Sequence, residues 1–276
     1  MNEDNTKIKG TLIALGGGDD DCLIQLIHSE FCKEGSYVEV ITTAATEPEE
    51  SGQAYKEAFK DLGMRHVHYM HIDEKNEADS KDNLERIKRA SVVFFTGGDQ
   101  RRIADFLRGT QVLEIMHDRY LHDELVIAGT SAGATALSDR MIYEGYGSYS
   151  LEKGRTKTST ALGFIQNLYI DTHFTERGRF GRLAMAVAKW PEYIGVGLGE
   201  ETGVVIKEGN YLEAFGRGVV TIIDGSKLQY TNLAEVEFGA PVAVENLVMH
   251  ILVEGHRYCI AERVFQPMPE KVAKEV

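Results

Sequence analysis

A serine between two glycines is the residue of this chain best placed for nucleophilic chemistry. The segment Gly129-Thr130-Ser131-Ala132-Gly133 follows directly on the apolar run Leu125–Ala128. A strand followed by Gly-x-Ser-x-Gly and by small residues is typical of a nucleophile elbow, in which the glycines let strand and helix pack closely. Such a turn presents the Ser131 hydroxyl, with the backbone N–H of Ala132 on the same side to bind an oxyanion. The alternative is a plain strand-to-helix turn with a serine cap, but the clear preceding strand favours a nucleophile.

A serine nucleophile needs a base and a group that orients the base. Of the nine histidines, His173 alone immediately follows an apolar run that comes after the serine motif, namely Leu168–Ile170. Elimination therefore favours His173 as general base. Glu200 and Glu201 both follow the apolar run Tyr193–Leu198, and a carboxylate there could orient the imidazole. These residues alone do not separate the two acids, and either could be a solvated turn residue.

A second glycine-containing segment, Thr96-Gly97-Gly98-Asp99-Gln100, follows the apolar run Val92–Phe95. Glycines at a strand end allow backbone N–H groups to face a ligand. Gly98 can therefore supply another oxyanion donor, and Gln100 can hold a substrate amide or carboxylate. Taken alone the signal is weak, because Gly-Gly-Asp also forms ordinary loops.

Two other motifs suit chemistry less well. Gly16-Gly17-Gly18 is followed by Asp19-Asp20-Asp21, where a phosphate-binding loop would need glycine and no negative charge, so we expect no dinucleotide. His66, His68 and His71 could suggest a metal site. In a strand, however, the first two side chains face one side and the third faces the other. We therefore expect neither a metal nor a cofactor.

The elements that position these motifs alternate along the chain. Near-continuous apolar, β-branched runs are typical of strands covered on both faces of a parallel sheet. Helical patterns such as Ala54–Leu62, with Gly63 as a C-terminal cap, lie between them. The alternation predicts a doubly wound α/β fold with a mostly parallel sheet and helices on both faces, flavodoxin-like or glutamine-amidotransferase-like. The predicted strands are Thr11–Leu15, Tyr37–Thr42, Val67–Ile72, Ser91–Phe95, Leu125–Ala128, Leu168–Ile170 and Tyr193–Leu198. Ligands of such sheets bind outside the carboxyl ends of the strands.

The C-terminal part has a different character. Short apolar runs separated by Gly-containing turns predict an antiparallel meander at the sheet edge, formed by Val204–Ile206, Tyr211–Phe215 and Val219–Ile223. We expect a helix around Val244–Val253 and a last strand near Tyr258–Ala261. Since no linker or repeat is visible, we expect one domain over residues 1–276.

Composition restricts the partners and the compartment. The 43 Asp and Glu against 30 Lys and Arg give a formal net charge of −13, which argues against nucleic acid or an anionic membrane as the main partner. No apolar run approaches the roughly 18 residues of a membrane span. Three cysteines without a CxxC pair read as reduced thiols, and the polar N-terminus lacks the features of a signal peptide. We therefore expect a soluble, cytoplasmic protein.

Taken together, the motifs resemble the cyanophycinase family, whose wider kin are the peptidase E serine peptidases. The resemblance runs from Leu12 to Phe265 and rests on four segments in order and spacing: Thr96–Gln100, Gly129–Ala134, Asp171-x-His173-Phe174 with its Arg-Gly-Arg-x-Gly-Arg run, and Gly199-Glu200. It implies the triad Ser131, His173 and Glu200, which singles out Glu200. The substrate-cleft residues that it implies are Gln100, Asp171, Arg177, Arg179 and Arg182. Arg182 is equally a candidate for a structural ion pair.

One position departs from the family pattern Asp-Gln-His-Phe, because Thr172 stands where the family has glutamine. We expect the Thr172 side chain to face or border the cleft rim, with one polar contact to the substrate shortened or lost.

Members of this family cleave cyanophycin, a poly-aspartate backbone with arginine joined to each side-chain carboxyl, and release β-Asp-Arg dipeptides. The resemblance thus implies a serine exopeptidase acting on cyanophycin or a β-aspartyl peptide, and a homodimer. Guanidinium groups suit the free carboxylates of such a polymer. One alternative is a related hydrolase of other aspartyl or isoaspartyl peptides, and another is an inactive binding homologue. An unrelated α/β-hydrolase esterase would order its triad Ser, acid, His and carry an HGGG-type loop, unlike this chain.

Overall fold

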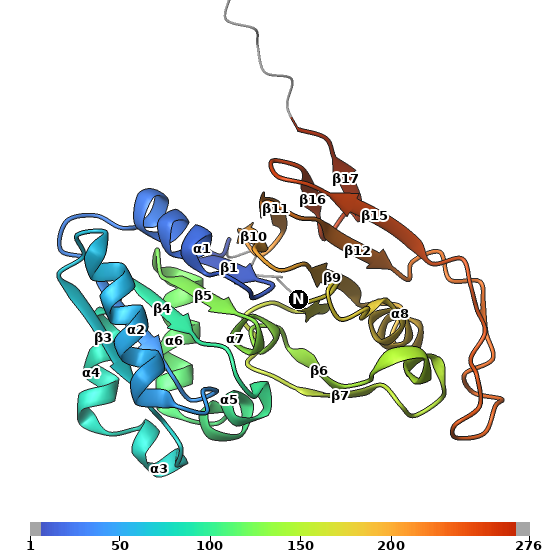
Figure 1. The fold of residues 1–276 in the computed structure, drawn as a ribbon, viewed down its shortest axis with the longest axis horizontal. Coiled ribbons are helices and arrows are strands. Elements are labelled where there is room, and N and C mark those ends of the chain that lie inside the picture. The colour runs from blue at the N-terminus through green and yellow to red at the C-terminus, as the bar shows by residue number, and fades with distance from the viewer. Residues whose placement is uncertain (1–6, 269–276) are drawn as a thin grey trace, which may run out of the picture.

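A nine-stranded mixed sheet forms the centre of the molecule. The computed structural model describes residues 7–268, and the strand order is β17-β16-β11-β10-β1-β5-β4-β2-β3 (Figure 1). Five neighbouring strands are parallel: β1 (Thr11–Leu15), β5 (Val126–Thr130), β4 (Val92–Phe95), β2 (Tyr37–Ile41) and β3 (His66–Met70). Four more strands extend the sheet beyond β1, each antiparallel to its neighbour: β10 (Thr202–Lys207), β11 (Tyr211–Gly216), β16 (Arg257–Cys259) and β17 (Val264–Gln266). The predicted α/β class with a mostly parallel sheet is confirmed.

The parallel strands are apolar throughout because their alternate side chains enter two different cores. On β1, Leu12 and Ala14 pack on one face, whereas Ile13 and Leu15 pack on the other. Each such Leu or Ile, fully buried, contributes about 1.5–3 kcal/mol. The first face is covered by α4 (Lys81–Arg89), α5 (Gln100–Leu107) and α6 (Gln111–His122). The second is covered by α1 (Asp21–Leu26), the π-helical turn Ile27–Phe31 and α2 (Pro48–Asp61).

A second sheet, in the order β15-β12-β9-β8, lies beside the first. It consists of β8 (Leu168–Asp171) and β9 (Ile194–Leu198), which are parallel, and of β12 (Val220–Asp224) and β15 (Val248–Leu252), which are antiparallel. The sequence predicted the β12 segment as part of the sheet-edge meander. Only β10 and β11 follow that prediction, and after them the chain crosses at Gly216-Arg217-Gly218 to pair with β9. Glycines on β9 allow helix α8 (Phe180–Lys189) to lie directly on it, since a Cβ at Gly195 would be 2.7 Å from Leu183.

The expected helix around Val244–Val253 is wrong. This segment forms β14 (Val244–Glu245) and β15, and β15 pairs antiparallel with β12. Its apolar residues Val244, Val248 and Leu252 recur every four positions, which also fits a helix face. The segment forms a strand and not a helix because it pairs with the open edge of β12. The last predicted strand is present as β16.

Several small elements complete the fold. A two-stranded arm of β6 (Arg140–Glu144) and β7 (Lys157–Thr160) lies beneath α8 in Figure 1, and was not predicted. The others are α3 (Lys75–Ala78), α7 (Ala132–Thr135), the 3₁₀ turn Gly147–Leu151 and β13 (Tyr230–Thr231), which pairs with β14. Within residues 7–268, no helix combines the length and the apolar character needed to cross a membrane. The cytoplasmic location stays a prediction, as does the single domain.

Candidate active site

Ser131, His173 and Glu200 meet where three strands end. Ser131 follows β5, His173 lies two residues beyond β8, and Glu200 lies two residues beyond β9. Ser131 Oγ is 2.8 Å from His173 Nε2, and His173 Nδ1 is 2.6 Å from Glu200 Oε1. Glu201 points elsewhere, because its carboxylate lies 3.6 Å from Arg217 at the surface. The structure therefore brings together a hydroxyl, an imidazole and a carboxylate in the order required for general-base activation.

The backbone at Ser131 is strained. Ser131 has φ 50° and ψ −114°, a conformation that costs a non-glycine residue roughly 1–3 kcal/mol. The flanking glycines are required by contact, since a Cβ at Gly129 would lie 2.6 Å from the Gly133 carbonyl carbon, and one at Gly133 2.2 Å from Phe95 O. The Ser131 N–H donates to Leu15 O at 3.0 Å. The surroundings thus hold a turn that the serine alone would not adopt.

The glycines after β4 lie against the serine. A Cβ at Gly97 would be 3.5 Å from Ser131 Cβ, so the Gly97-Gly98 backbone passes directly beside the nucleophile. Gly98 has φ +136° and approaches Ala44 O so closely that no side chain fits there. Gln100 begins α5, and its Nε2 donates to Ile142 O at 3.0 Å. Two residues without side chains therefore border this side of Ser131.

The arginine run after His173 divides into buried and exposed members. Arg182 is 2% exposed and forms two hydrogen bonds to the fully buried Asp171, one of them 2.7 Å from Nε to Oδ2. The sequence left two roles open for Arg182, in the substrate cleft or in a structural ion pair, and this geometry fits the ion pair. Arg177, in contrast, is exposed.

Arg179 lies between these extremes and keeps an unused donor. One of its terminal nitrogens donates to Thr172 O at 2.6 Å and lies 3.6 Å from Asp171. Its Nε is buried and has no hydrogen-bond partner among residues 7–268. Burial, with the nearby charge of Arg182, lowers the pKa of Arg179 to about 10.

Thr172 does not lie where the sequence suggested. Its side chain is 2% exposed, and its hydroxyl is 3.4 Å from Thr135 Oγ1 in the interior. The expectation that it borders the cleft rim is wrong. The chain turns immediately afterwards at His173, with φ 46°, and the Thr172 side chain stays in the interior.

Sequence reasoning missed the loop after β1. Gly16-Gly17-Gly18 was considered only as a phosphate loop, yet a Cβ at Gly17 would meet the His173 ring at 2.5 Å. Asp20, in the same loop, accepts hydrogen bonds from Thr130 and Tyr55. Because β1 is a parallel neighbour of β5, the strand-end rule applied to every strand would have found this loop.

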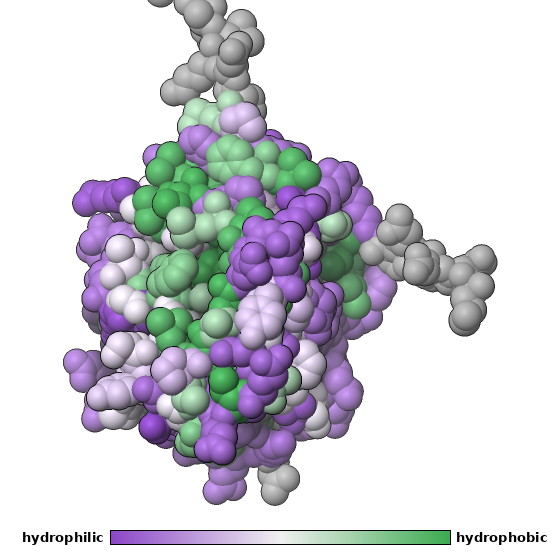
Figure 2. All heavy atoms as spheres, turned by 90° about the vertical axis from the view of Figure 1, so that its right-hand side faces the viewer, coloured by the Kyte–Doolittle hydropathy of each residue, from purple (hydrophilic) through white to green (hydrophobic). Residues whose placement is uncertain are grey.

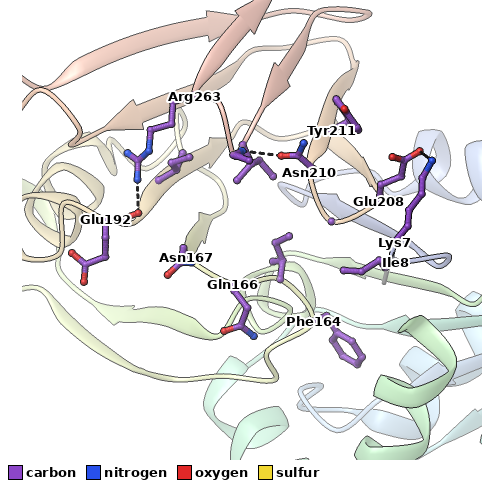
Figure 3. Close-up of a pocket in the computed structure, with 15 residues that line it drawn as sticks. Lys7, Ile8, Phe164, Gln166, Asn167, Glu192, Glu208, Asn210, Tyr211 and Arg263 are labelled. Atoms are coloured by element: carbon purple, nitrogen blue, oxygen red, sulfur yellow. Dashed lines mark hydrogen bonds and ion pairs between the residues drawn. The ribbon is translucent and has the colours of Figure 1, made fainter. Parts of the chain in front are cut away.

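A cavity of about 780 Å³ lies at the opposite ends of the same strands (Figure 3). Its lining includes Ile8, which precedes β1, and Asn167, which precedes β8, whereas the Ser131 site follows these strands. Figure 3 shows the Lys7–Glu208 ion pair of 2.7 Å on its wall. In the part of the chain that the structure describes, no group of three or more His, Cys, Asp or Glu is placed to hold a metal ion.

An α/β fold in which strand ends of two sheets bring together a serine, an imidazole and a carboxylate is typical of a hydrolase, and comparison with known proteins specifies it as a peptidase. Residues 12–213 match the model of Peptidase family S51. The chain belongs to this family.

Named relatives agree over most of the chain. A cyanophycinase of Synechococcus elongatus is 32% identical over 254 residues, covering 91% of this chain and 79% of the relative. A cyanophycinase of Trichormus variabilis is 33% identical over 269 residues, covering 96% and 90%. These comparisons confirm the resemblance that the motifs indicated.

Two solved structures share the fold. One is a peptidase from an acI-B1 Actinobacterium, with a TM-score of 0.64 and 20% identity, covering 92% of this chain and 98% of the other. The second is a putative peptidase E protein from Listeria monocytogenes EGD-e, with a TM-score of 0.52 and 17% identity, covering 76% and 99%. At these identities the likeness concerns the fold alone.

Proposed function

We propose that this chain is a serine exopeptidase that degrades cyanophycin to β-Asp-Arg dipeptides through an acyl-enzyme. The observation that carries the chemistry is the continuous hydrogen-bonded row from Ser131 Oγ through His173 to Glu200. The substrate assignment is supported by the relatives called cyanophycinase. It is further supported by the arginines beside the site, which suit the carboxylates of the polymer. The net charge of −13 suits the arginine side chains of the polymer.

The acylation step uses the row directly. His173 Nε2 takes the proton of Ser131 Oγ while the oxygen attacks the scissile carbonyl, and the N–H groups of Gly98 and Ala132 stabilise the oxyanion. Glu200 stabilises the imidazolium that forms. Collapse of the intermediate breaks the C–N bond, and the imidazolium gives its proton to the leaving amine.

Deacylation repeats the sequence with water. His173 takes a proton from the water as it attacks the ester carbonyl, and a second oxyanion forms in the same place. Its collapse releases the product carboxylic acid and returns the proton to Ser131 Oγ. No metal or cofactor takes part in either step.

Arginine side chains next to His173 fit a polymer rich in carboxylates. Arg177 is exposed and Arg179 keeps 12% of its side chain exposed, so both can present guanidinium N–H groups to backbone or side-chain carboxylates of the substrate. Gln100 would add an amide contact from the start of α5. Asp171 serves this cleft by holding Arg182 and Arg179 in place. Thr172, being buried, would affect specificity only through packing.

Incubation with purified cyanophycin, followed by mass analysis of the products, tests the proposal. We expect β-Asp-Arg from the wild type and none from Ser131→Ala. Hydrolysis of isoaspartyl dipeptides without attack on the polymer would instead support the related hydrolase. A wild type that neither turns over peptides nor reacts with a serine-directed fluorophosphonate would be the inactive binding homologue.

A homodimer is part of the same proposal, and an open strand edge supports it. β15 is one of the two edge strands of the four-stranded sheet in the described chain, and its Met249, Ile251 and neighbouring Val253 are 45–54% exposed. Figure 2 faces this side and shows apolar residues gathered in its upper part, where β15 and β17 lie. Two copies can pair this edge about a two-fold axis, which removes both exposed edges.

Size-exclusion chromatography with light scattering, which gives the molar mass of the eluted protein, tests the dimer. We expect twice the monomer mass for the wild type and the monomer mass for Ile251→Asp. Leu121→Asp, at an exposed apolar residue of α6, is the matched control and should remain dimeric. A monomeric wild type at micromolar concentration would contradict the proposal.

A further inference from the structure

Three consecutive carbonyl groups at the end of β1 hold the backbone of all three active-site segments. Leu15 O accepts from Ser131 N at 3.0 Å, and Gly16 O accepts from His173 N at 2.8 Å. Gly17 O accepts from the N–H of Glu201, next to Glu200, at 2.8 Å. The three acceptors are adjacent in sequence, whereas the three donors come from segments after β5, β8 and β9. A shift of this one loop would therefore move every member of the row.

The same loop also packs against the side chains of the row. A Cβ at Gly17 would touch His173 Nε2 at 2.7 Å, and one at Gly18 would touch Glu200 Cβ at 3.0 Å. The loop backbone thus covers both the imidazole and its carboxylate partner. Its conformation, with φ +95° at Gly17 and +89° at Gly18, is not one that other residues adopt readily.

Asp20 fixes the far end of this loop by side-chain hydrogen bonds. Its Oδ1 accepts from Thr130 Oγ1 at 2.6 Å, and its Oδ2 accepts from the Tyr55 hydroxyl. Thr130 is the residue before Ser131, and Tyr55 belongs to α2. Burial raises the pKa of the Asp20 carboxyl, while the two hydroxyl donors oppose that effect. A half-buried carboxylate with two donors is a fixed point between the loop, the elbow and the helix.

We propose that Asp20 is a positioning residue for the serine chemistry, holding the Leu15–Gly18 loop so that its carbonyls keep Ser131, His173 and Glu200 in line. This inference rests on the proposed function, since it concerns the same nucleophile. Without the carboxylate, the hydroxyls of Thr130 and Tyr55 lose their acceptor and the loop loses its link to the elbow. A displacement of about 1 Å at reacting groups typically costs about 10²-fold in rate.

The test uses the rate of labelling by a fluorophosphonate, which requires an activated serine but no particular peptide. We expect Asp20→Ala to lower this rate by about 10²-fold. On a hydrolysed peptide, kcat should fall with KM little changed. The proton resonance of the His173 Nδ1–H, bonded to Glu200, should broaden or disappear. Asp19→Ala, an exposed neighbour in the same loop, is the control and should match wild type in all three measurements.

Each outcome decides the inference. A folded Asp20→Ala protein with the wild-type labelling rate and an unchanged resonance would overturn it, with the proposed function left intact. If Asp20→Ala does not fold, Thr130→Val and Tyr55→Phe each remove one hydrogen bond. Both are expected to lower labelling, and wild-type rates in both would overturn the inference. A wild type that the probe does not label at all would overturn the proposed function and this inference together.

Discussion

Alanine at position 17 would press a methyl group against the His173 imidazole. A Cβ on the Gly17 backbone lies 2.5 Å from His173 Cε1 and 2.7 Å from Nε2, whereas ordinary contacts begin at 3.4 Å. Either the ring or the loop must therefore move by about 1 Å. We expect Gly17→Ala to disturb catalysis through this contact more than through any change in folding.

The magnitude follows from the distances. Moving the ring by about 1 Å along the Ser131–His173 bond would lengthen it from 2.8 Å to a separation at which no hydrogen bond forms. The expected loss in kcat is about 10²–10³-fold, with KM little changed. Alanine at φ +95° adds strain of roughly 1–2 kcal/mol. In a chain of this size that lowers the unfolding temperature by about 2–8 °C.

Gly63→Ala supplies the matched control. Gly63 has φ +93°, nearly that of Gly17, but no atom of the described residues lies within 4 Å of the added Cβ. It therefore carries the same backbone strain without the contact. Both variants would be compared by calorimetry, by fluorophosphonate labelling and by peptide hydrolysis. Gly17→Ala with a kcat within about threefold of Gly63→Ala would refute the argument that this contact sets the position of the base.

Further substitutions separate catalytic from structural roles. Ser131→Ala should fold normally and lose about 10⁴–10⁶ in hydrolysis rate, so retention of a tenth of the activity would contradict its role. Glu200→Gln should reduce kcat far more than Glu201→Gln, whose carboxylate faces Arg217; the reverse ranking in folded proteins would exclude Glu200 as the orienting acid. Arg182→Gln leaves Asp171 buried without its main partner and should cost about 3–5 kcal/mol of unfolding free energy, measured in urea. A loss below about 1 kcal/mol would show that the pair is not structural.

The central sheet could be predicted because its signal is local. Strands such as Thr11–Leu15 are apolar on both faces, and this predicts burial between two layers without knowledge of their neighbours. The rule that ligands lie beyond the carboxyl ends of strands then leads to Ser131 and His173. Their closeness in the structure depends on strand order, which the sequence does not state.

What the sequence could not predict depends on contacts between distant segments. Whether Val220–Asp224 joins the first sheet or the second is decided by its pairing with β9, and the glycines of β9 matter only because α8 lies on them. Thr172 was assigned to the rim because it lies next to His173 at a strand end, but the chain turns at His173, with φ 46°, and Thr172 is buried. The segment around Val244–Val253 was assigned to a helix, but its apolar spacing fits a strand as well.

The division of the site between two sheets has a consequence for the newly made chain. Ser131 follows β5 of the nine-stranded sheet, whereas His173 and Glu200 follow β8 and β9 of the other sheet. The hydroxyl is therefore an ordinary alcohol until the two sheets have docked, since an isolated serine has no base within reach. During synthesis Ser131 leaves the ribosome well before Glu200 does, and in that interval the chain cannot hydrolyse its neighbours. For the proposed row from Ser131 to Glu200, serine chemistry thus begins only after the two sheets have docked.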